Sequence, residues 1–307
     1  MTRVSSFGHN QTMINQTLRN QERLFTDQRQ VNSGKKSEDY RGLSREAAAL
    51  LGAKSVMTRT EKYIDTAKEL KGRLAMNNLG LETLSQAGES LRETVLNGIA
   101  NGQTNGFGEA LNQLFSTVKN ALNTKVGGVY LFAGTRSDTP PLALNSLADL
   151  VSAPDAASTF QNNQVKPTAR IDDNITMEHG LLADDVGADL LQALKNLADF
   201  NAGASGPIEG KLTATQRSFL EGEIATIKSA LDGLTQKTVE NGIRQNRVEQ
   251  IKVRHEDNKT FLAGFISDKE DVDMAATISK LNNDQVALEA SYKVLSNLTR
   301  LSLLDFI

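Results

Sequence analysis

The fold is decided by the closing stretch of the chain, residues 268–307, which reads DKEDVDMAATISKLNNDQVALEASYKVLSNLTRLSLLDFI. Alternating steps of three and four residues connect Ile278, Leu281, Gln285, Leu288, Tyr292 and Leu295. This spacing is typical of a helix that packs along another helix. The pattern continues loosely through Leu298 and ends in an apolar tip at Leu303, Leu304 and Phe306. Exposed apolar area is unfavourable by about 25 cal/mol per Å², so we expect the tip to contact another part of the chain or another subunit.

A weaker apolar stripe lies near the start of the chain, in a predicted helix from His9 to Val31. Such a helix needs a partner, because packing supplies most of the stability of helices in proteins. The C-terminal helix is the candidate partner. We therefore predict a subunit-assembly interface on the two terminal helices, formed by Ile14, Leu18, Phe25, Val31, Ile278, Leu281, Leu288, Tyr292, Leu295, Leu298, Leu303, Leu304 and Phe306.

Two further helices are predicted to be unusually long. The first extends from Ala47 to about Ile99, which corresponds to about 80 to 90 Å at 1.5 Å per residue. The second extends from about Ala214 to Phe261 and begins at a capping box made by Thr213 and Gln216. Its seam passes through the polar positions Thr238, Asn241 and Gln245, and polar seam positions fix helix register at a cost in stability.

The middle of the chain has a different character. Gly, Pro, Asn and Asp punctuate residues 136–185, and Ile171, Ile175 and Met177 indicate a strand. We predict a mainly α protein, with a long α-helical coiled-coil rod formed by the N- and C-terminal segments and a small β-rich inserted domain. The predicted segments are an N-terminal assembly helix and turn, the two parts of the rod separated by the inserted domain, and a C-terminal assembly helix, at residues 1–42, 43–135, 136–185, 186–265 and 266–307.

Composition argues against several classes of function. The formal net charge of −3 is unlike that of a dedicated nucleic-acid binder, and the absence of cysteine excludes disulfides and thiol catalysis. The first ten residues contain no apolar segment of secretory-signal length, and no apolar run approaches a membrane span. We therefore expect no membrane insertion, and export, if it occurs, without a cleaved signal peptide.

No catalytic, cofactor or metal site is predicted. Asp268, Glu270, Asp271 and Asp273 lack the glycine and spaced ligands of a calcium loop, and we expect these acids to favour the start of the last helix through its dipole. The histidines His9, His179 and His255 have no neighbour at metal-ligand spacing, and we expect His255 at a helix seam. Phosphate-loop, nucleophile-elbow and dinucleotide fingerprints are missing. An enzyme is therefore the least favoured class.

Several segments of the chain resemble the bacterial flagellin superfamily. They are Val31–Lys36 after the first helix, Asn241–Glu249 in the second long helix, and Asp271–Ala275 together with Leu288–Tyr292 and Leu301–Ile307. The closing segment is more similar to the hook-filament junction branch, the hook-associated protein 3 family, than to filament flagellin. The same holds for Tyr130–Thr135 followed by Thr139–Leu142.

The resemblance implies a structural component of the bacterial flagellum that joins hook to filament. It implies type III export to the cell exterior, with the help of an export chaperone. The expected partners are further copies of the chain in a ring-like homo-oligomer, an adjacent hook-associated protein on the hook side and flagellin on the filament side. A filament-forming flagellin is the nearest alternative, and an intracellular coiled-coil adaptor would also fit the heptads.

Overall fold

The computed structural model describes the backbone of residues 2–43 and 46–304, and the side chains of residues 8, 11–43 and 46–297. The elements follow in the order α1 (Thr2–Ser33), α2 (Ala47–Asn101), β1 (Gln103–Thr104), α3 (Phe107–Leu122), β2 (Lys125–Val126), β3 (Val129–Tyr130), α4 (Leu147–Ser152), the 3₁₀ helix η1 (Ala157–Thr159), β4 (Thr168–Asp172), β5 (Ile175–Glu178), α5 (Ala183–Ala202), β6 (Gly210–Lys211), α6 (Ala214–Glu270) and α7 (Met274–Leu304). The predicted fold class, mainly α with a small β-containing region, is confirmed.

The chain divides into two compact units. The first combines the described residues up to Thr60 with those from Asp257 onward, and the second is Glu61–Glu256. The five segments predicted from the sequence stay a prediction.

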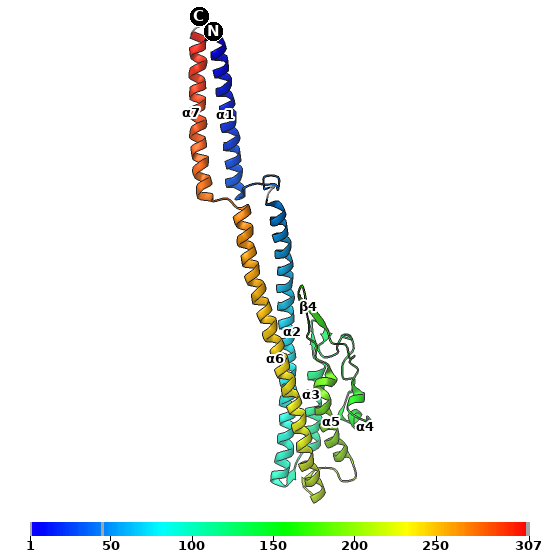
Figure 1. Cartoon of the computed structure of the whole chain (residues 1–307). Helices are drawn as coiled ribbons and strands as arrows, with labels where there is room; N and C mark the ends of the chain where they lie inside the picture. Colours follow the sequence, from blue (N-terminus) through cyan, green and yellow to red (C-terminus); the bar gives the residue numbers. More distant parts are fainter. Residues whose placement is uncertain (1, 44–45, 305–307) are drawn as a thin grey trace. The chain divides into compact units, whose positions relative to one another are not determined.

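In the first unit, α1 and α7 lie side by side and run in opposite directions (Figure 1). The predicted pairing of the terminal helices is therefore confirmed. Gly34 ends α1, because its φ of 70° leaves the helical region and favours glycine. The Gly34 amide donates to the carbonyl of Gln30 at 2.9 Å, which satisfies one carbonyl of the last turn.

In the second unit, α2 and α6 run in opposite directions, and α3, α5 and α4 lie beside them (Figure 1). One hydrophobic core joins these helices, with fully buried side chains such as Leu84, Leu91 and Phe115. Residues of the predicted insertion belong to the same core, including Leu142 and Leu150. The insertion thus packs on the helices through a shared core.

A second hydrophobic cluster lies where the hairpin β4–β5 packs on α2 and α6. Its members are Ala67, Leu70, Leu74, Ile171, Met177, Val248 and Ile251. The two strands pair antiparallel, as Ala169 opposite Met177 illustrates, with an irregularity between Arg170 and Asp172. The single strand predicted from Ile171, Ile175 and Met177 is wrong in its extent, because a turn after Asp172 divides these residues between β4 and β5. The other two sheets, β1–β6 and β2–β3, are two-stranded and two residues long on each strand.

The hairpin is also anchored by polar contacts. The Tyr63 hydroxyl donates to the Asp173 carboxylate at 3.0 Å, and His255 Nε2 lies 2.8 Å from the Ile171 carbonyl oxygen. The Tyr63 and His255 rings stack with their centroids 5.4 Å apart. His255 is buried, so the prediction that it lies at a helix seam is confirmed.

The boundaries of the long helices agree with the sequence at three of four ends. Helix α2 ends at Asn101, two residues past the prediction, and both hydrogen bonds of the Thr213–Gln216 capping box are present, at 3.0 and 3.2 Å. The predicted end of α6 near Phe261 is wrong, because the helix continues to Glu270. No proline interrupts that segment, and the helix ends where the Val272 amide turns to donate to the Gly34 carbonyl at 3.0 Å.

Candidate assembly interface

The pair of α1 and α7 has a polar inner seam. The less exposed positions on α1 include Met13, Thr17, Asn20, Leu24, Asp27 and Val31, and those on α7 include Thr277, Leu281, Asp284, Leu288, Ser291 and Leu295. Both sets alternate steps of four and three residues, as expected for two helices that pack along their length. Among the described side chains, none of the fully buried apolar ones belongs to α1 or α7, whereas Thr17, Asn20 and Thr277 are buried.

Hydrogen bonds connect the two helices across this seam. Asn20 Nδ2 donates to Ser291 Oγ at 3.0 Å, and Gln21 Nε2 donates to the Tyr292 hydroxyl. An ion pair between Arg23 and Asp284 spans 3.5 Å. Exposed ion pairs contribute little to stability, so the pair depends on half-buried apolar residues and a few polar contacts.

The seam predicted for α7 is wrong at every second position. Leu281, Leu288 and Leu295 do lie at less exposed positions, but Ile278 and Tyr292 are 43% and 46% exposed. The neighbouring residues Thr277, Asp284 and Ser291 occupy the inner positions instead. Small polar side chains at these positions allow the helices to approach and to form hydrogen bonds with each other.

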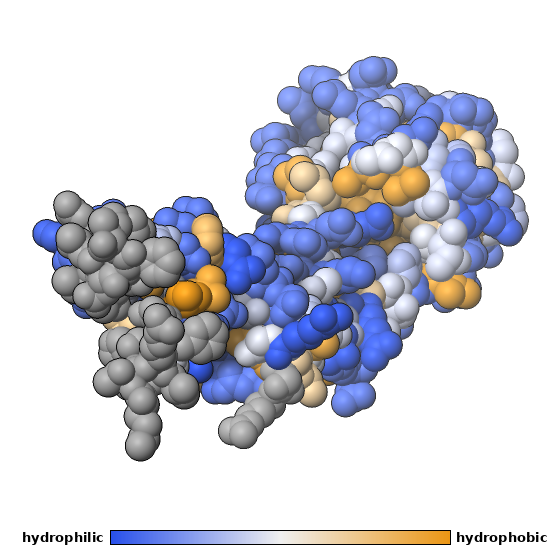
Figure 2. All heavy atoms as spheres, turned by 90° about the horizontal axis from the view of Figure 1, so that it is seen from above, coloured by the Kyte–Doolittle hydropathy of each residue, from blue (hydrophilic) through white to orange (hydrophobic). Residues whose placement is uncertain are grey.

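The predicted interface residues of α1 are likewise more exposed than expected for an inner seam. Ile14, Leu18 and Phe25 are 41%, 56% and 62% exposed, while Val31 is half-buried. Viewed from above, the surface is predominantly hydrophilic and its hydrophobic side chains form small groups (Figure 2). Four other predicted interface residues, Leu298, Leu303, Leu304 and Phe306, lie outside the described side chains.

The segment that follows α1 and the segment that precedes α7, called the two connectors below, are hydrogen-bonded to each other. Lys35 and Asp271 form an antiparallel bridge, and the Lys36 amide donates to the Glu270 carbonyl at 2.8 Å. Lys35 Nζ lies 2.6 Å from the Asp271 carboxylate, and Lys54 Nζ lies 2.7 Å from that of Glu270. For three of the four acids predicted to favour the start of the last helix the prediction is wrong, because Asp268 and Glu270 lie in α6 and Asp271 pairs with Lys35. Asp273 does cap α7, since its carboxylate accepts from the Ala276 amide at 3.0 Å.

These ion pairs shift the ionisation of their members. The hydrogen bond from Lys54, followed by the charge of Lys35, holds the pKa of Glu270 below its ordinary value. The hydrogen bond from Lys35 likewise lowers the pKa of Asp271, and the same contact raises the pKa of Lys35. The connector is thus stabilised in its charged form at neutral pH.

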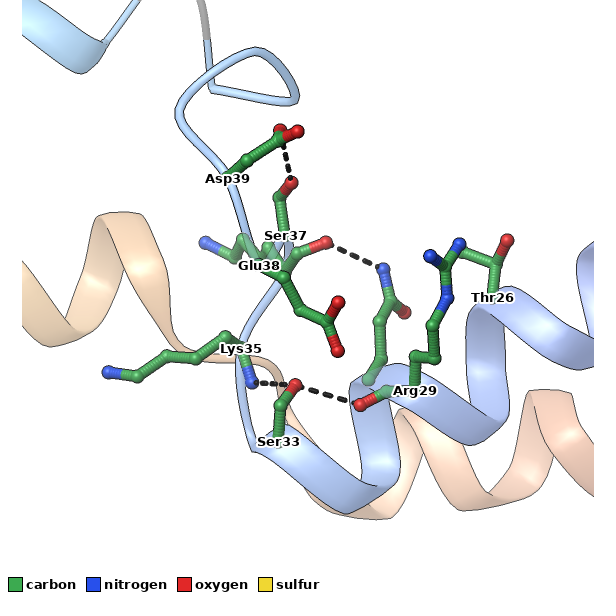
Figure 3. A pocket seen from close by; sticks show the side chains of 9 residues that line it. Thr26, Arg29, Ser33, Lys35, Ser37, Glu38 and Asp39 are labelled. Atoms are coloured by element: carbon green, nitrogen blue, oxygen red, sulfur yellow. Dashed lines mark hydrogen bonds between the residues drawn. The ribbon is translucent and has the colours of Figure 1, made fainter.

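A polar pocket of about 240 Å³ lies against the connector, at the end of α1 (Figure 3). Its lining includes Arg29 and Glu38, so it carries charge of both signs. Gln30 Nε2 donates to the Lys36 carbonyl at 2.9 Å, and the Lys35 amide donates to Ser33 Oγ at 3.2 Å. The Lys35 side chain points away from the pocket (Figure 3). These hydrogen bonds hold the turn after α1.

Metal chemistry finds no support in the described part of the chain, where no group of three or more His, Cys, Asp or Glu residues is placed to hold an ion. Asp184 and Asp185 lie in the first turn of α5, and Asp185 pairs with Lys166 at 2.7 Å. Burial lowers the pKa of His179. The side chain of His9 lies outside the described residues.

Among the described helices, none has the length and apolar content needed to cross a membrane.

The segment Tyr130–Thr135, just before the predicted insertion, packs against α2. Phe132 is fully buried, and a Cβ atom added to Gly80 of α2 would lie 2.6 Å from its ring. Glycine at position 80 therefore permits the ring to pack directly on the helix backbone. Gly134 adopts a φ of 67°, and the carbonyl of Phe132 accepts from the Ala183 amide at 2.9 Å at the start of α5. The motif thus holds together β3, α2 and α5.

A buried lysine that the sequence did not single out fixes α4. Lys195 of α5 is 5% exposed, and its Nζ donates to the carbonyls of Leu150 and Val151, each at 3.1 Å. Its charge is balanced by Asp199, whose carboxylate lies 3.1 Å away. An ammonium group at the end of a helix satisfies its last carbonyls. The i, i+4 spacing of Lys195 and Asp199 is the signal that sequence inspection could have used.

Comparison with known proteins places part of the chain in a family. Residues 224–307 match the family model of the bacterial flagellin C-terminal helical region, so the resemblance to flagellins is confirmed for that part. None of the curated proteins matches this chain in sequence.

Solved structures show the same fold at low sequence identity. A structure described as a flagellar hook-associated protein from Vibrio parahaemolyticus has a TM-score of 0.58 and 19% identity, and the match covers 73% of this chain and 97% of that one. Bacillus cereus FlgL matches with a TM-score of 0.54 and 16% identity over 71% of this chain and 99% of its own. Flagellar hook associated protein-3 from Legionella pneumophila matches with a TM-score of 0.56 and 12% identity, over 70% and 97%. The chain therefore carries a flagellin C-terminal region within a fold that these proteins share.

Proposed function

We propose that this chain is a structural component of the bacterial flagellum, a hook-associated junction protein that connects hook to filament. The observation that carries the proposal is a flagellin C-terminal helical region whose last helix pairs with α1 through a seam without a fully buried apolar side chain among the described residues. Such a pair leaves apolar side chains of both helices exposed, and these side chains can contact other subunits.

During assembly, the terminal helices would become fully ordered by packing against helices of a neighbouring subunit. Helices that bury little apolar surface are marginally stable alone, and they order when a neighbour covers their exposed face. The purified monomer is therefore expected to have protease-sensitive ends, at about residues 1–40 and 265–307. Equal resistance to proteolysis along the whole chain would count against this mechanism.

The exposed apolar side chains of α1 suit such a contact. Ile14, Leu18 and Phe25 are separated by four and seven residues, so they share one face of the helix. Ile278 and Tyr292 are separated by fourteen residues, two heptads, and share a face of α7. On the proposed function these five residues meet neighbouring subunits, while Val31, Leu281, Leu288 and Leu295 hold the pair together.

The partners follow from the same proposal. The chain would form a ring-like homo-oligomer, with an adjacent hook-associated protein on one side and flagellin on the other. It would reach the cell exterior through flagellar type III export without a cleaved signal peptide, helped by an export chaperone. Its role would be structural and not catalytic.

Deletion of residues 296–307 tests the role of the C-terminal segment. Cells that carry the deletion are expected to retain hooks and to shed flagellin into the medium. Normal, attached filaments would refute the assembly role of this segment.

A double substitution tests the exposed face of α1 more finely. Leu18→Asp with Phe25→Asp places two charges on the proposed contact, and filaments are expected to detach while the purified protein keeps its helix content. Gln16→Asp with Gln28→Asp is the matched control, because both glutamines are exposed on the same helix. Equal effects of the two double variants would show that the apolar face has no special role.

The alternative, a filament-forming flagellin, shares the terminal helices and differs in self-assembly. Polymerisation of the purified chain alone into long filaments would favour it. An intracellular adaptor would instead be found in the cytoplasm and not in the flagellar fraction.

A further inference from the structure

A layer of polar side chains separates the two hydrophobic clusters of the unit Glu61–Glu256. One cluster contains Leu74 of α2 and Val248 of α6, and the other begins at Leu81 of α2 and ends at Leu234 of α6. The residues between these limits include Asn77 and Asn241, which are 2% and 0% exposed. Two asparagine side chains are therefore enclosed where the apolar packing is interrupted.

The amide groups of this layer are held in defined orientations. Asn241 Nδ2 and Gln245 Nε2 each donate to the Leu74 carbonyl at 2.9 Å, and Asn77 Nδ2 donates to the His179 carbonyl at 3.1 Å. A carbonyl oxygen accepts hydrogen bonds and cannot donate them. The nitrogen of each asparagine must therefore face its carbonyl partner, which fixes where each Oδ1 atom points.

Three buried polar atoms of this layer have no hydrogen-bond partner in the protein. They are Asn77 Oδ1, Asn241 Oδ1 and Arg244 Nη1. Buried polar groups in native proteins are nearly always satisfied by protein or by ordered water, because an unpaired one is costly. Three of them in one layer indicate a common partner that is not a protein group.

The three atoms belong to facing turns of α2 and α6. Asn77 lies one turn after Leu74, and Arg244 lies one turn after Asn241, which is bonded to Leu74. The Leu74 carbonyl accepts from both Asn241 and Gln245, so it lies level with the turn between these two residues. Because the helices run in opposite directions, Asn77, one turn further along α2, lies about level with Asn241. Burial, and after it the charges of Arg73 and Arg244, lowers the pKa of His179, whose backbone carbonyl is the partner of Asn77. The charge of Arg244 thus acts on the residue that binds Asn77, and its Nη1 atom is buried like the two asparagine oxygens.

The chemistry of these atoms selects the ligand. Two amide oxygens require a donor of two hydrogen bonds, and a guanidinium nitrogen requires an acceptor. A cation would face the positive charge of Arg244, and an anion would face the two amide oxygens. A water molecule donates two hydrogen bonds and accepts the third, which is the usual number for buried water.

We propose that a single water molecule is bound between Asn77 Oδ1, Asn241 Oδ1 and Arg244 Nη1, and that it completes the polar layer between α2 and α6. The site gives a role to the signature Asn241–Glu249, which the assembly proposal leaves unused. A fully satisfied polar layer fixes the register of two long helices, since a shift by one turn would leave its groups unpaired.

A high-resolution crystal structure of the purified full-length protein tests the site directly. The expected result is an ordered water at about 2.6–3.2 Å from all three atoms. A direct hydrogen bond from Arg244 to either asparagine, with no water between them, would overturn the proposal.

Oxygen-17 magnetic relaxation dispersion tests it in solution, because it counts waters that stay bound for longer than nanoseconds. The double variant Asn77→Leu with Asn241→Leu should hold one long-lived water fewer than the wild type. Thr238→Val is the matched control, since the Thr238 hydroxyl bonds only to Leu234 of its own helix, and it should keep the wild-type count. An unchanged count in the folded double variant would refute the site.

Thermal unfolding adds a test of coupling. Each single leucine variant is expected to lower Tm by about 2–4 °C or more, as for a loss near 1 kcal/mol in a unit of this size. The second substitution should cost less than it does alone, because the water has already been lost. Strictly additive shifts would mean that the two asparagines do not share a ligand.

Discussion

Replacing Asn20 with leucine should tighten the pair of terminal helices. Asn20 is 4% exposed at the inner seam of α1, and its side chain donates to Ser291 Oγ at 3.0 Å. Leucine has the same number of side-chain heavy atoms as asparagine and branches at the same carbon, so the substitution exchanges polar contacts for apolar ones in a side chain of similar shape. Ser291 keeps its own bond to the Ala287 carbonyl, at 2.7 Å. Arg23 Nη2 also donates to Asn20 Oδ1, at 2.6 Å, but the Arg23 side chain is exposed and keeps its ion pair with Asp284, so no buried donor is left unpaired.

The size of the effect follows from two opposing contributions. Full burial of a leucine side chain stabilises by about 1.5–3 kcal/mol. The lost hydrogen bond to Ser291 removes about 0.5–1.5 kcal/mol, whereas the bond from the exposed Arg23 is exchanged for hydrogen bonds with water at little net cost. The net gain is about 1 kcal/mol, which lowers the fraction of open molecules about fivefold.

Hydrogen exchange measured by mass spectrometry reads out this opening. Peptides from α1 and α7 should exchange about fivefold more slowly in Asn20→Leu than in the wild type, whereas peptides from α3 and α5 should not change. Asn15→Leu is the matched control, because Asn15 is exposed on the same helix and should give no protection. Equal or faster exchange of α1 and α7 in Asn20→Leu would refute the assignment of Asn20 to the seam.

Three further predictions concern other parts of the chain. Phe132→Ala should lower the free energy of unfolding by about 3–5 kcal/mol, because it empties a fully buried site; an unchanged urea midpoint would contradict this packing. Lys195→Met should cost about 1–3 kcal/mol, because it removes the ammonium donor from the carbonyls of Leu150 and Val151, and the Leu150 carbonyl keeps only its bond from the Ala153 amide. Hydrogen exchange should rise first in α4, and wild-type exchange there would argue against the cap. Because Lys54 lowers the pKa of Glu270, their contact contributes stability above the ordinary carboxyl pKa and loses it as the pH falls through the lowered value. Exchange at the connector should therefore rise in acid, and Lys54→Met should weaken that pH dependence; a wild-type pH profile in the variant would be evidence against the ion pair.

The long helices could be predicted because their signal is repeated many times. Apolar residues recur along α2 from Leu50 to Leu74 and again from Leu81 to Val95, so a long helix that begins near Ala47 and ends near Ile99 can be predicted from the pattern alone. The capping box at Thr213 and the buried asparagine at position 241 were also readable, because local chemistry determines both.

The seam of the terminal helices could not be read in the same way. Apolar periodicity favours Ile278 and Tyr292, yet Thr277 and Ser291 lie inside. Where the seam is polar, hydrogen bonds with the partner helix decide which residues face inward, and those bonds depend on the three-dimensional arrangement. On the proposed function, neighbouring subunits would cover these outward-facing larger residues.

The packing of the insertion could not be predicted from the sequence, for a different reason. Leu142 and Leu150 pack into the core shared by α3 and α5, and those contacts join residues that are far apart along the chain. Lys195 is similar, because a lysine is expected at the surface unless carbonyl groups and a carboxylate meet it inside. Its partners at the end of α4 become visible only in the folded chain.

The pairing of the two connectors also determines the order in which the parts of the chain can fold. Lys35 and Asp271 are separated by 236 positions, so their contact closes a loop that contains the entire unit Glu61–Glu256. Loop closure costs conformational entropy, and the cost falls when the enclosed segment is already compact. The unit Glu61–Glu256 can therefore fold first, and its completion brings the two distant connectors within reach. If the chain emerges from a narrow channel with its N-terminus leading, α1 has to wait for nearly the whole sequence to follow before its partner arrives, and during that interval it is available to any neighbouring molecule that offers a matching helix.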